Sequence, residues 1–194
     1  MKLRIIAGVL GRRMITVEKG AQEFRPTQER IRQAAAETLK PRIPGARAAD
    51  LCAGSGAFGI ELASRGAASV DFVEDNPARA RSILKHCEAF GIGRQCRVVT
   101  QDVRGFLDAC VGGAGSGGYD IVFYDPPYSE PALAALVPAL CGLLAAGGVF
   151  VYERARDGSP QGGRLGGSGY DVETRTYGDT AVEFIKKKQG AGSE

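Results

Sequence analysis

From about residue 47 onward the chain alternates short apolar strands with helical segments, and this alternation restricts the fold more than any other feature. Strands are predicted at 48–52, 69–73, 97–100, 120–124 and 149–152, with helices between them at 57–65, 76–90, 103–110 and 130–145. Pro138 is expected to kink or split the last of these helices. Two further strands, near 170–175 and 181–186, are joined by Gly178-Asp179 and predict a hairpin. Strands that alternate with helices indicate an α/β fold, Rossmann-like, with helices on both faces of a mostly parallel seven-stranded sheet and a C-terminal antiparallel hairpin.

The segment before this core has a different charge and a different pattern. Residues 1–47 hold eleven Lys or Arg and four Glu, a net charge of +7, whereas the remainder has fourteen basic and eighteen acidic residues, a net of −4. Strands near 4–7 and 13–17 predict a short β-hairpin, and a helix is expected from about Thr27 until Pro41. We therefore expect a basic N-terminal extension at 1–46 packed on the core, a core at 47–188, and a disordered tail at 189–194. The basic extension suits a polyanion such as nucleic acid, or is a solvated surface.

Composition excludes several classes of protein. No apolar run reaches 18 residues, and the first residues lack the pattern of a secretory signal, so we expect a cytoplasmic protein without a membrane partner. The five cysteines form no Cys-x-x-Cys pair, which indicates free thiols. The single histidine, His86, is expected to be a solvated group on the helix 76–90, and no metal site is predicted.

A glycine-rich loop joins the first core strand to the next helix. Gly54, Gly56 and Gly59 fit the spacing G-x-G-x-x-G, which lets the backbone turn sharply beside a nucleotide-like ligand. Both a dinucleotide and S-adenosylmethionine use an acid after the second strand for ribose hydroxyls, and Glu74 has that place. Asp50 would repel a pyrophosphate but suits a cationic ammonium or sulfonium, which favours S-adenosylmethionine. Asp102, after the third strand, could accept from the adenine amine or begin a helix.

The second motif, Asp125-Pro126-Pro127-Tyr128, directly follows the apolar strand 120–124. Two prolines fix the backbone, and neither has an N–H. A carboxylate and a fixed carbonyl can together accept both hydrogens of a planar amine, leaving its lone pair directed at a methyl donor. Tyr128 can stack on a base. A merely rigid loop is the simpler alternative, but the preceding strand and the glycine loop favour the chemical role.

With these motifs the chain resembles the class I S-adenosylmethionine-dependent methyltransferases that act on exocyclic or amide nitrogens. More narrowly, it is similar to the bacterial 16S rRNA guanine-N2 methyltransferases of the small ribosomal subunit. The matching segments, in chain order, are residues 4–8, 11–13, 25–27 with Arg30 and Arg32, the loop 50–59, Glu74, Asp102, 125–128 and 177–180. The resemblance implies methylation of the exocyclic N2 of a guanine in 16S rRNA, with S-adenosyl-L-methionine as cofactor and no metal. We expect a monomer.

The resemblance also implies roles for individual residues. The catalytic residues are Asp125, Pro126, Pro127 and Tyr128. The cofactor-binding residues are Asp50, Cys52, Gly54, Ser55, Gly56, Glu74, Asp75, Asp102 and Val103. The substrate-binding residues are Arg4, Arg12, Arg13, Arg25, Thr27 and Arg30, of which the last three could instead hold the methionine carboxylate of the cofactor. Cys52 departs from the pattern, since an aromatic or other apolar residue is expected there.

Three other functions compete with this interpretation. A DNA adenine-N6 methyltransferase uses the same Asp-Pro-Pro-Tyr chemistry, but reading a DNA sequence usually takes a separate module, and only about 45 residues lie outside the predicted core. A nicotinamide-dependent oxidoreductase shares the glycine loop, but Asp50 and the two prolines count against it. A non-catalytic RNA-binding assembly factor could retain the fold, and failure to bind S-adenosylmethionine would favour it.

Overall fold

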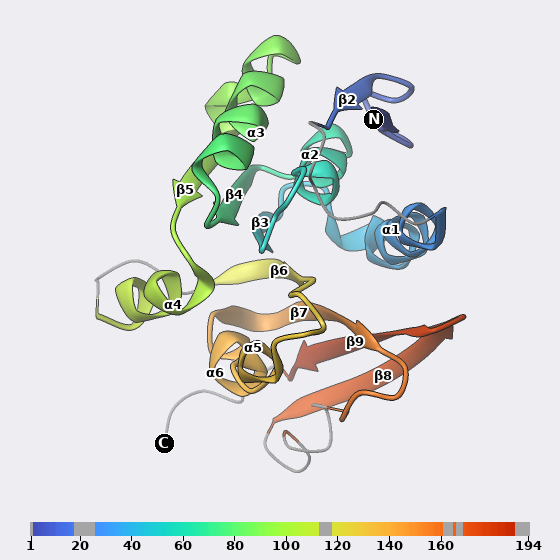
Figure 1. Cartoon of the computed structure of the whole chain (residues 1–194), viewed down its shortest axis with the longest axis vertical. Coiled ribbons are helices and arrows are strands. Elements are labelled where there is room, and N and C mark those ends of the chain that lie inside the picture. The colour runs from blue at the N-terminus through green and yellow to red at the C-terminus, as the bar shows by residue number, and fades with distance from the viewer. Residues whose placement is uncertain (1, 18–25, 113–117, 161–164, 166–168, 189–194) are drawn as a thin grey trace. The chain divides into compact units, whose positions relative to one another are not determined.

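The computed structural model describes residues 2–17, 26–112, 118–160, 165 and 169–188. The chain forms two compact units, Met1–Val103 and Arg104–Glu194. Each unit is described by itself below, and Figure 1 labels their elements.

The first unit is built on three parallel strands in the order β5-β4-β3. Their bounds are β3 Arg47–Leu51, β4 Ser69–Glu74 and β5 Cys96–Thr100, and Asp50 lies opposite Phe72 in the register. The helices are α2 Ala57–Ser64 and α3 Pro77–Ala89, with a short 3-10 turn, η2, at Gly93–Gln95. Helix α3 lies along β4 and β5 (Figure 1). The side chain of Asn76 accepts hydrogen bonds from the backbone of Ala78 and Arg79, which confirms the predicted helix start.

The N-terminal segment of this unit forms a hairpin and a helix. The hairpin pairs β1 Lys2–Arg4 with β2 Met14–Thr16, and the helix is α1 Pro26–Leu39, followed by the 3-10 turn η1 Lys40–Arg42. The hairpin is attached to α2 through its backbone, because the amides of Ile6 and Ala7 donate to the buried carboxylate of Glu61 at 2.7 and 3.0 Å. The amide of Leu10 donates to the Ser64 hydroxyl at 3.0 Å. The amide of Val9 donates to the Ser64 carbonyl at 2.8 Å, so the loop is fixed on α2 by four backbone amides.

The expectation for His86 is wrong. This side chain is half-buried, its Nε2 accepts a hydrogen bond from the Thr16 amide at 3.2 Å, and its ring stacks on Phe90. Burial lowers the pKa of His86. The helix spacing alone suggested a solvated position, because the sequence does not reveal that β2 packs there.

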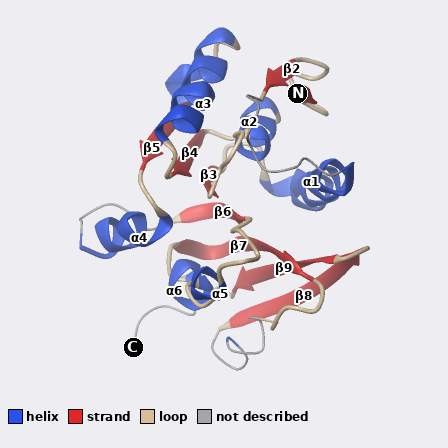
Figure 2. Cartoon of the chain, viewed as in Figure 1, coloured by secondary structure: helices blue, strands red, loops and turns tan. Residues whose placement is uncertain are grey.

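The second unit holds four strands in the order β6-β7-β9-β8. Strand β6, Tyr119–Tyr124, is parallel to β7, Leu144–Ala155. Strand β9, Thr180–Lys187, is antiparallel to β7, and β8, Tyr170–Tyr177, is antiparallel to β9. Figure 2 shows the long β8–β9 hairpin beside β7. The helices are α4 Val103–Gly112, α5 Pro131–Ala134 and α6 Val137–Cys141.

One predicted helix is shorter than expected. The segment 130–145 forms two short helices, α5 and α6, and Pro138 lies in the first turn of the second. Strand β7 begins five residues earlier than predicted, because Leu144 pairs with Tyr119. A proline in the first turn loses no helical hydrogen bond, so Pro138 splits the predicted helix by starting a second one, as expected of a proline at this position.

The predicted fold class is confirmed. The first unit has parallel strands in the order β5-β4-β3, and the second has a parallel β6–β7 pair extended by the antiparallel β9 and β8, so the strands are mostly parallel, alternate with helices and end in an antiparallel C-terminal hairpin. Among the residues that the structure describes, no helix is long and apolar enough to cross a membrane. The predicted division at residues 46 and 188 remains a prediction, and the tail 189–194 lies outside the described residues.

Candidate functional site

The loop after β3 is built from left-handed backbone. Cys52, Gly54 and Gly56 have φ angles of 59°, 56° and 71°. A side chain on Gly56 would also meet Ile83 of α3 at 2.9 Å, whereas the space around Gly54 is open apart from the Cys52 carbonyl at 3.9 Å. The loop is therefore a turn with open space at its apex, and Cys52 adopts a conformation that favours glycine.

Asp50 lies beneath this loop, at the end of β3. It is only 2% exposed, and its Oδ2 accepts a hydrogen bond from the Gly59 amide at 2.8 Å. A side chain on Gly59 would strike the Phe72 ring, so glycine is required there by packing. Burial raises the pKa of Asp50 to about 7, against the lowering effects of the Gly59 hydrogen bond and the Arg32 charge. Asp50 thus joins β3 to the first turn of α2.

Glu74, at the end of β4, connects the loop to α3. Its Oε2 accepts from the Gly54 amide at 2.7 Å, and its Oε1 accepts from the Asn76 amide at 3.0 Å and from Arg79 Nε at 2.7 Å. Arg79 Nη2 lies 2.6 Å from Oε1 and 3.1 Å from the exposed Asp75 carboxylate. Burial raises the pKa of Glu74 despite these hydrogen bonds. The structure therefore brings Asp75 and Glu74 together with the glycine loop.

Sequence reasoning missed Arg79. An arginine in the first turns of a helix has many possible partners, and only the fold shows that it reaches back to Glu74. The five-residue spacing after an acid that ends a strand is the signal that could have found it.

The remaining predicted cofactor residues lie on the same unit. Ser55 Oγ accepts from the Ala57 amide at 3.4 Å, at the start of α2. Asp102 is exposed between β5 and α4, and Val103 is buried in the first turn of α4.

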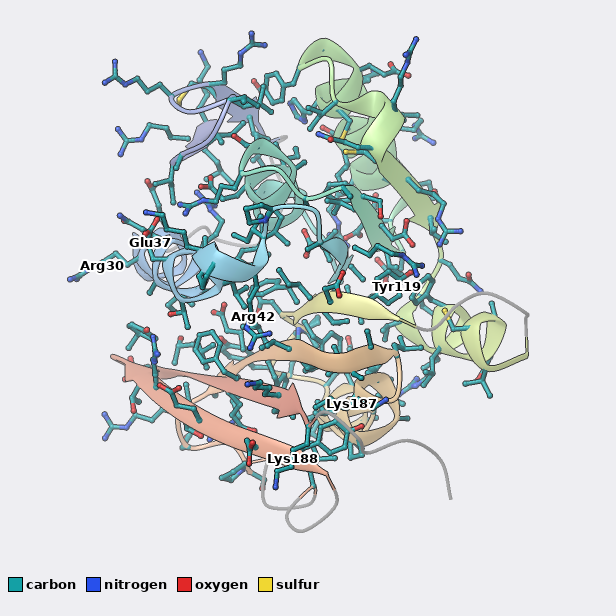
Figure 3. The ribbon with its side chains drawn as sticks, turned by 180° about the vertical axis from the view of Figure 1, so that it is seen from behind. Arg30, Glu37, Arg42, Tyr119, Lys187 and Lys188 are labelled. Carbon is teal, nitrogen blue, oxygen red and sulfur yellow. The ribbon has the colours of Figure 1, made fainter. Side chains whose placement is uncertain are left out.

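The predicted substrate arginines are mostly on the surface. Arg4, Arg12 and Arg13 are exposed on or beside the hairpin, and the Arg13 guanidinium lies 5.6 Å from the centre of the Phe90 ring. Arg30 is exposed at the outer side of α1 (Figure 3). Arg25 lies outside the described residues, and Thr27 is the second residue of α1.

Arg32 differs from these arginines because it is buried, and its Nη2 donates to the Arg4 carbonyl at 3.0 Å. Burial lowers its pKa. It holds the hairpin against α1, so its side chain has a packing role in addition to its charge.

The second unit carries the other predicted residues in the loop after β6. Asp125 and Pro127 are half-buried, Pro126 is buried and Tyr128 is 48% exposed. The Tyr128 hydroxyl donates to Glu153 Oε1 at 3.1 Å. Burial raises the pKa of Tyr128, and the nearby charges of Glu153 and Asp125 raise it further. The loop therefore presents a carboxylate and an aromatic ring whose hydroxyl is anchored.

Glu153 is a buried residue beside this loop that the sequence prediction missed. It lies on β7, one residue beyond the predicted strand 149–152, and is 3% exposed. Burial raises its pKa to about 7, against the lowering effect of the Tyr128 hydrogen bond. The pattern that could have revealed it is a carboxylate that directly continues an apolar strand.

A buried ion pair fixes the chain next to Glu153. Arg154 Nε donates to Glu183 Oε1 of β9 at 2.6 Å, and both residues are buried. Arg154 Nη1 also donates to the carbonyls of Ala155, Arg156 and Gly158. These bonds hold the end of β7, so Glu153 lies on a rigid element.

The chain is similar to several known proteins. The family model described as Conserved hypothetical protein 95 matches residues 3–186. The putative rRNA methyltransferase YlbH of Bacillus subtilis (strain 168) is 28% identical over 189 residues, which cover 96% of this chain and 100% of the relative. Ribosomal RNA small subunit methyltransferase D of Escherichia coli (strain K12) is 33% identical over 140 residues, 72% of this chain and 67% of the relative.

A solved structure extends the similarity to the whole fold. The structure of the putative methyltransferase yhhF from Escherichia coli superposes with a TM-score of 0.80 at 27% identity, covering 97% of this chain and 99% of that chain. The family match spans nearly all of the sequence, including the glycine loop and the Asp125–Tyr128 segment. The chain therefore belongs to the family described as Conserved hypothetical protein 95, the family of ribosomal RNA small subunit methyltransferase D.

Proposed function

We propose that this protein methylates the exocyclic N2 of a guanine in the 16S rRNA of the small ribosomal subunit. The observation that carries the proposal is the loop Asp125-Pro126-Pro127-Tyr128, which presents a carboxylate and an anchored, half-exposed aromatic ring directly after β6. The relatives named as rRNA small subunit methyltransferases support the substrate class. The guanine and its N2 position come from the resemblance of the motifs.

The cofactor is S-adenosylmethionine, and the residues of the first unit fit it. The glycine loop has open space at Gly54 and is bordered by the carboxylates of Asp50 and Glu74. Carboxylates suit an ammonium, a sulfonium and ribose hydroxyls, whereas they would repel a pyrophosphate. The residues that would hold the cofactor are Asp50, Cys52, Gly54, Ser55, Gly56, Glu74, Asp75, Asp102 and Val103. When bound, it supplies an electrophilic methyl group on a positively charged sulfur.

The acceptor loop would orient the amine. Asp125 accepts one N2 hydrogen and the Pro126 carbonyl accepts the other, so the nitrogen lone pair is turned out of conjugation. The nitrogen becomes acidic as its bond to the methyl group forms, so its proton can pass late to water, without a strongly basic residue. Tyr128 stacks on the base, and Pro127 keeps the loop rigid. Catalysis then depends on positioning and electrostatics.

The N-terminal extension would bind the RNA backbone. Arg4, Arg12 and Arg13 are exposed on a hairpin that is fixed to α2, which suits contacts that position phosphates without reading sequence. Arg25, Thr27 and Arg30 would hold either an RNA phosphate or the methionine carboxylate. We further propose that residues 1–46 act as this extension on a methyltransferase core at 47–188, and that the protein works as a cytoplasmic monomer.

The proposal is tested by methyl transfer from labelled S-adenosylmethionine. Undermethylated small subunits, naked 16S rRNA and duplex DNA are offered in parallel, and the modified nucleoside is identified by mass spectrometry. We expect N2-methylguanosine in RNA. N6-methyladenine in DNA would instead identify a DNA methyltransferase, and absence of both label and cofactor binding would indicate an RNA-binding assembly factor.

A further inference from the structure

The buried carboxylate of Glu153 has a different kind of partner from the other buried glutamates among the described residues. Glu61 lies 2.7 Å from Arg65, Glu74 lies 2.6 Å from Arg79, and Glu183 lies 2.6 Å from Arg154. Glu153 is equally buried, but among the described residues its hydrogen bond is to the neutral hydroxyl of Tyr128. A buried carboxylate without a cation is costly, so its burial is not explained by stability.

Its partner is the residue that the acceptor loop exposes. Tyr128 follows two prolines, and the residue is 48% exposed. The hydroxyl at the far end of the ring donates to Glu153 on β7 at 3.1 Å and also has a side-chain hydrogen bond with Thr180 on β9. The ring is thus held at both ends, by a stiff backbone and by hydrogen bonds to two strands, although the residue as a whole is half exposed.

We propose that Glu153 is a positioning residue for the acceptor base, which acts by fixing the Tyr128 ring in the orientation on which the base stacks. This inference rests on the proposed function, since it assumes that a base binds against the Asp125–Tyr128 loop. It predicts that substitution of Glu153 weakens the use of the RNA substrate through Tyr128 and leaves the binding of S-adenosylmethionine unchanged. A rigid aromatic ring binds a base with less loss of freedom than a mobile one.

The ionisation of Glu153 makes the strength of its hydrogen bond with Tyr128, the anchor of the ring, depend on pH. Burial raises its pKa to about 7, so the carboxylate accepts from Tyr128 above this pH and is protonated below it. The charged and titratable groups around the pair are Asp125 after β6, whose charge acts on Tyr128 and Tyr152, and the mutually paired Arg154 and Glu183 of β7 and β9. Hydrogen bonds to a charged acceptor are the stronger ones, so the ring is held best above pH 7.

The experiment measures kcat and the two KM values, for RNA and for S-adenosylmethionine, at pH 6 and pH 8. The variants are Y128F, E153Q, E153L and the double variant E153L/Y128F, with E173Q on the exposed edge strand β8 as the matched control. We expect Y128F and E153L each to lower kcat/KM for RNA at pH 8 by about tenfold, as for one hydrogen bond to a charged group. The double variant should lose no more than Y128F alone, because Y128F already removes the hydrogen bond to Glu153 together with the one to Thr180.

E153Q tests whether the effect depends on the charge of Glu153, because a purely structural role would give no difference between pH 6 and pH 8. Its amide remains a neutral acceptor, so at pH 6 it should match the wild type, and at pH 8 it should fall several-fold below it. The KM for S-adenosylmethionine should be unchanged in every variant, and E173Q should behave as wild type. Additive losses in the double variant, an equal rise in the KM for the cofactor, or an unchanged pH profile in E153Q would each overturn the proposal.

A measurement without turnover separates this inference from the proposed function. If the wild-type protein transfers no methyl group, the proposed function fails, and the anchor is tested by carbon-13 NMR of the glutamate carboxyls. Glu153 should titrate near pH 7, and its pKa should rise in Y128F because the Tyr128 hydrogen bond lowers it. A Glu153 titration that is identical in Y128F and wild type would overturn the anchor itself. E153Q and Y128F keep this test available even where E153L fails to fold.

Discussion

Asp125 stands where the chain leaves β6, followed by two prolines that restrict its backbone. If it accepts a hydrogen of the reacting amine, D125A should lower kcat about 100-fold, the usual scale for losing one preorganised electrostatic contact in a transition state. Binding of S-adenosylmethionine should change by less than about twofold, because Asp125 lies in the other unit from the cofactor residues. Single-turnover transfer and calorimetric titration measure the two quantities.

The exposed Asp108 of α4 provides the control for this substitution. D108A should retain both transfer and cofactor binding. An equal loss of transfer and of cofactor affinity in D125A would contradict the assigned role.

Asp50 makes stability depend on pH. Burial raises its pKa in the folded protein to about 7 from an ordinary value of 3.8, so between these values the folded chain holds a proton that the unfolded chain has released. This contribution to stability is complete below pH 4 and is lost as pH rises through 7. D50N should therefore exceed the wild type in unfolding free energy at pH 8, by at most about 4 kcal/mol, with the difference disappearing toward pH 4.

Urea unfolding at pH 4, 6 and 8 measures this difference. Glu153 changes the unfolding free energy in the same direction, since its pKa is also raised to about 7. D50N should therefore remove only part of the decline in wild-type stability as pH rises. D108N serves as the exposed control and should follow the wild type. A gap between D50N and wild type that is constant across these pH values would refute the linkage.

At the scale of the element, the N-terminal hairpin presents its arginines from a fixed loop. Its backbone is bonded to Glu61 and Ser64 of α2, and Arg12 and Arg13 are exposed at its end. R12E/R13E should weaken RNA binding by at least about tenfold at low salt and lower the slope of log affinity against log salt by about two. Filter binding over a salt series measures both.

R156E/K186E is the matched control, because it changes net charge equally on exposed residues of the second unit. It should leave the salt slope nearly unchanged. An unaltered slope in R12E/R13E would mean that the hairpin arginines form only a solvated surface.

Elements with local signals were predictable, and elements decided by tertiary pairing were not. Asn76-Pro77 marks the start of α3 because capping depends on adjacent residues. The start of β7 at Leu144 has no such signal, since Ala145 and Ala146 favour a helix and only pairing with Tyr119 makes the segment a strand. Helix α5 similarly ends at Ala134, where the sequence continues with helix-forming residues.

At the scale of the molecule, the cofactor residues come from separate elements of one unit, so binding should stabilise the fold. S-adenosylmethionine at 100 times its Kd should add about 2.7 kcal/mol to the unfolding free energy. E74A should abolish most of this gain, because it removes the acid that is bonded to the glycine loop. R79A is the control, since it leaves Glu74 in place, and it should bind the cofactor at least as tightly.

Differential scanning fluorimetry with increasing cofactor measures this stabilisation. An undiminished shift in E74A would remove Glu74 from the cofactor site. D125A should show the full shift, which links this result to the residue-scale prediction.

The candidate site was predictable where it follows a contiguous motif. Asp50, Glu74 and Asp125 each stand at the end of a strand that the apolar pattern reveals, so their placement follows from the alternation of elements. Arg79 and Glu153 could not be predicted in the same way, because their roles depend on partners that the fold brings near. Arg79 reaches a strand end five residues away, and Glu153 reaches a tyrosine 25 residues away.

The contact between Arg79 and Glu74 has a kinetic consequence. If Glu74 receives the ribose of the cofactor, the guanidinium that lies 2.6 Å from it must give up part of its hold. Capture of the cofactor is then an exchange of partners, slower than a diffusional encounter, and added salt speeds it by loosening the ion pair. Different residues would therefore set the two rates. Glu74 would set the residence time of the cofactor, and Arg79, which pairs with Glu74 before binding, would set the association rate.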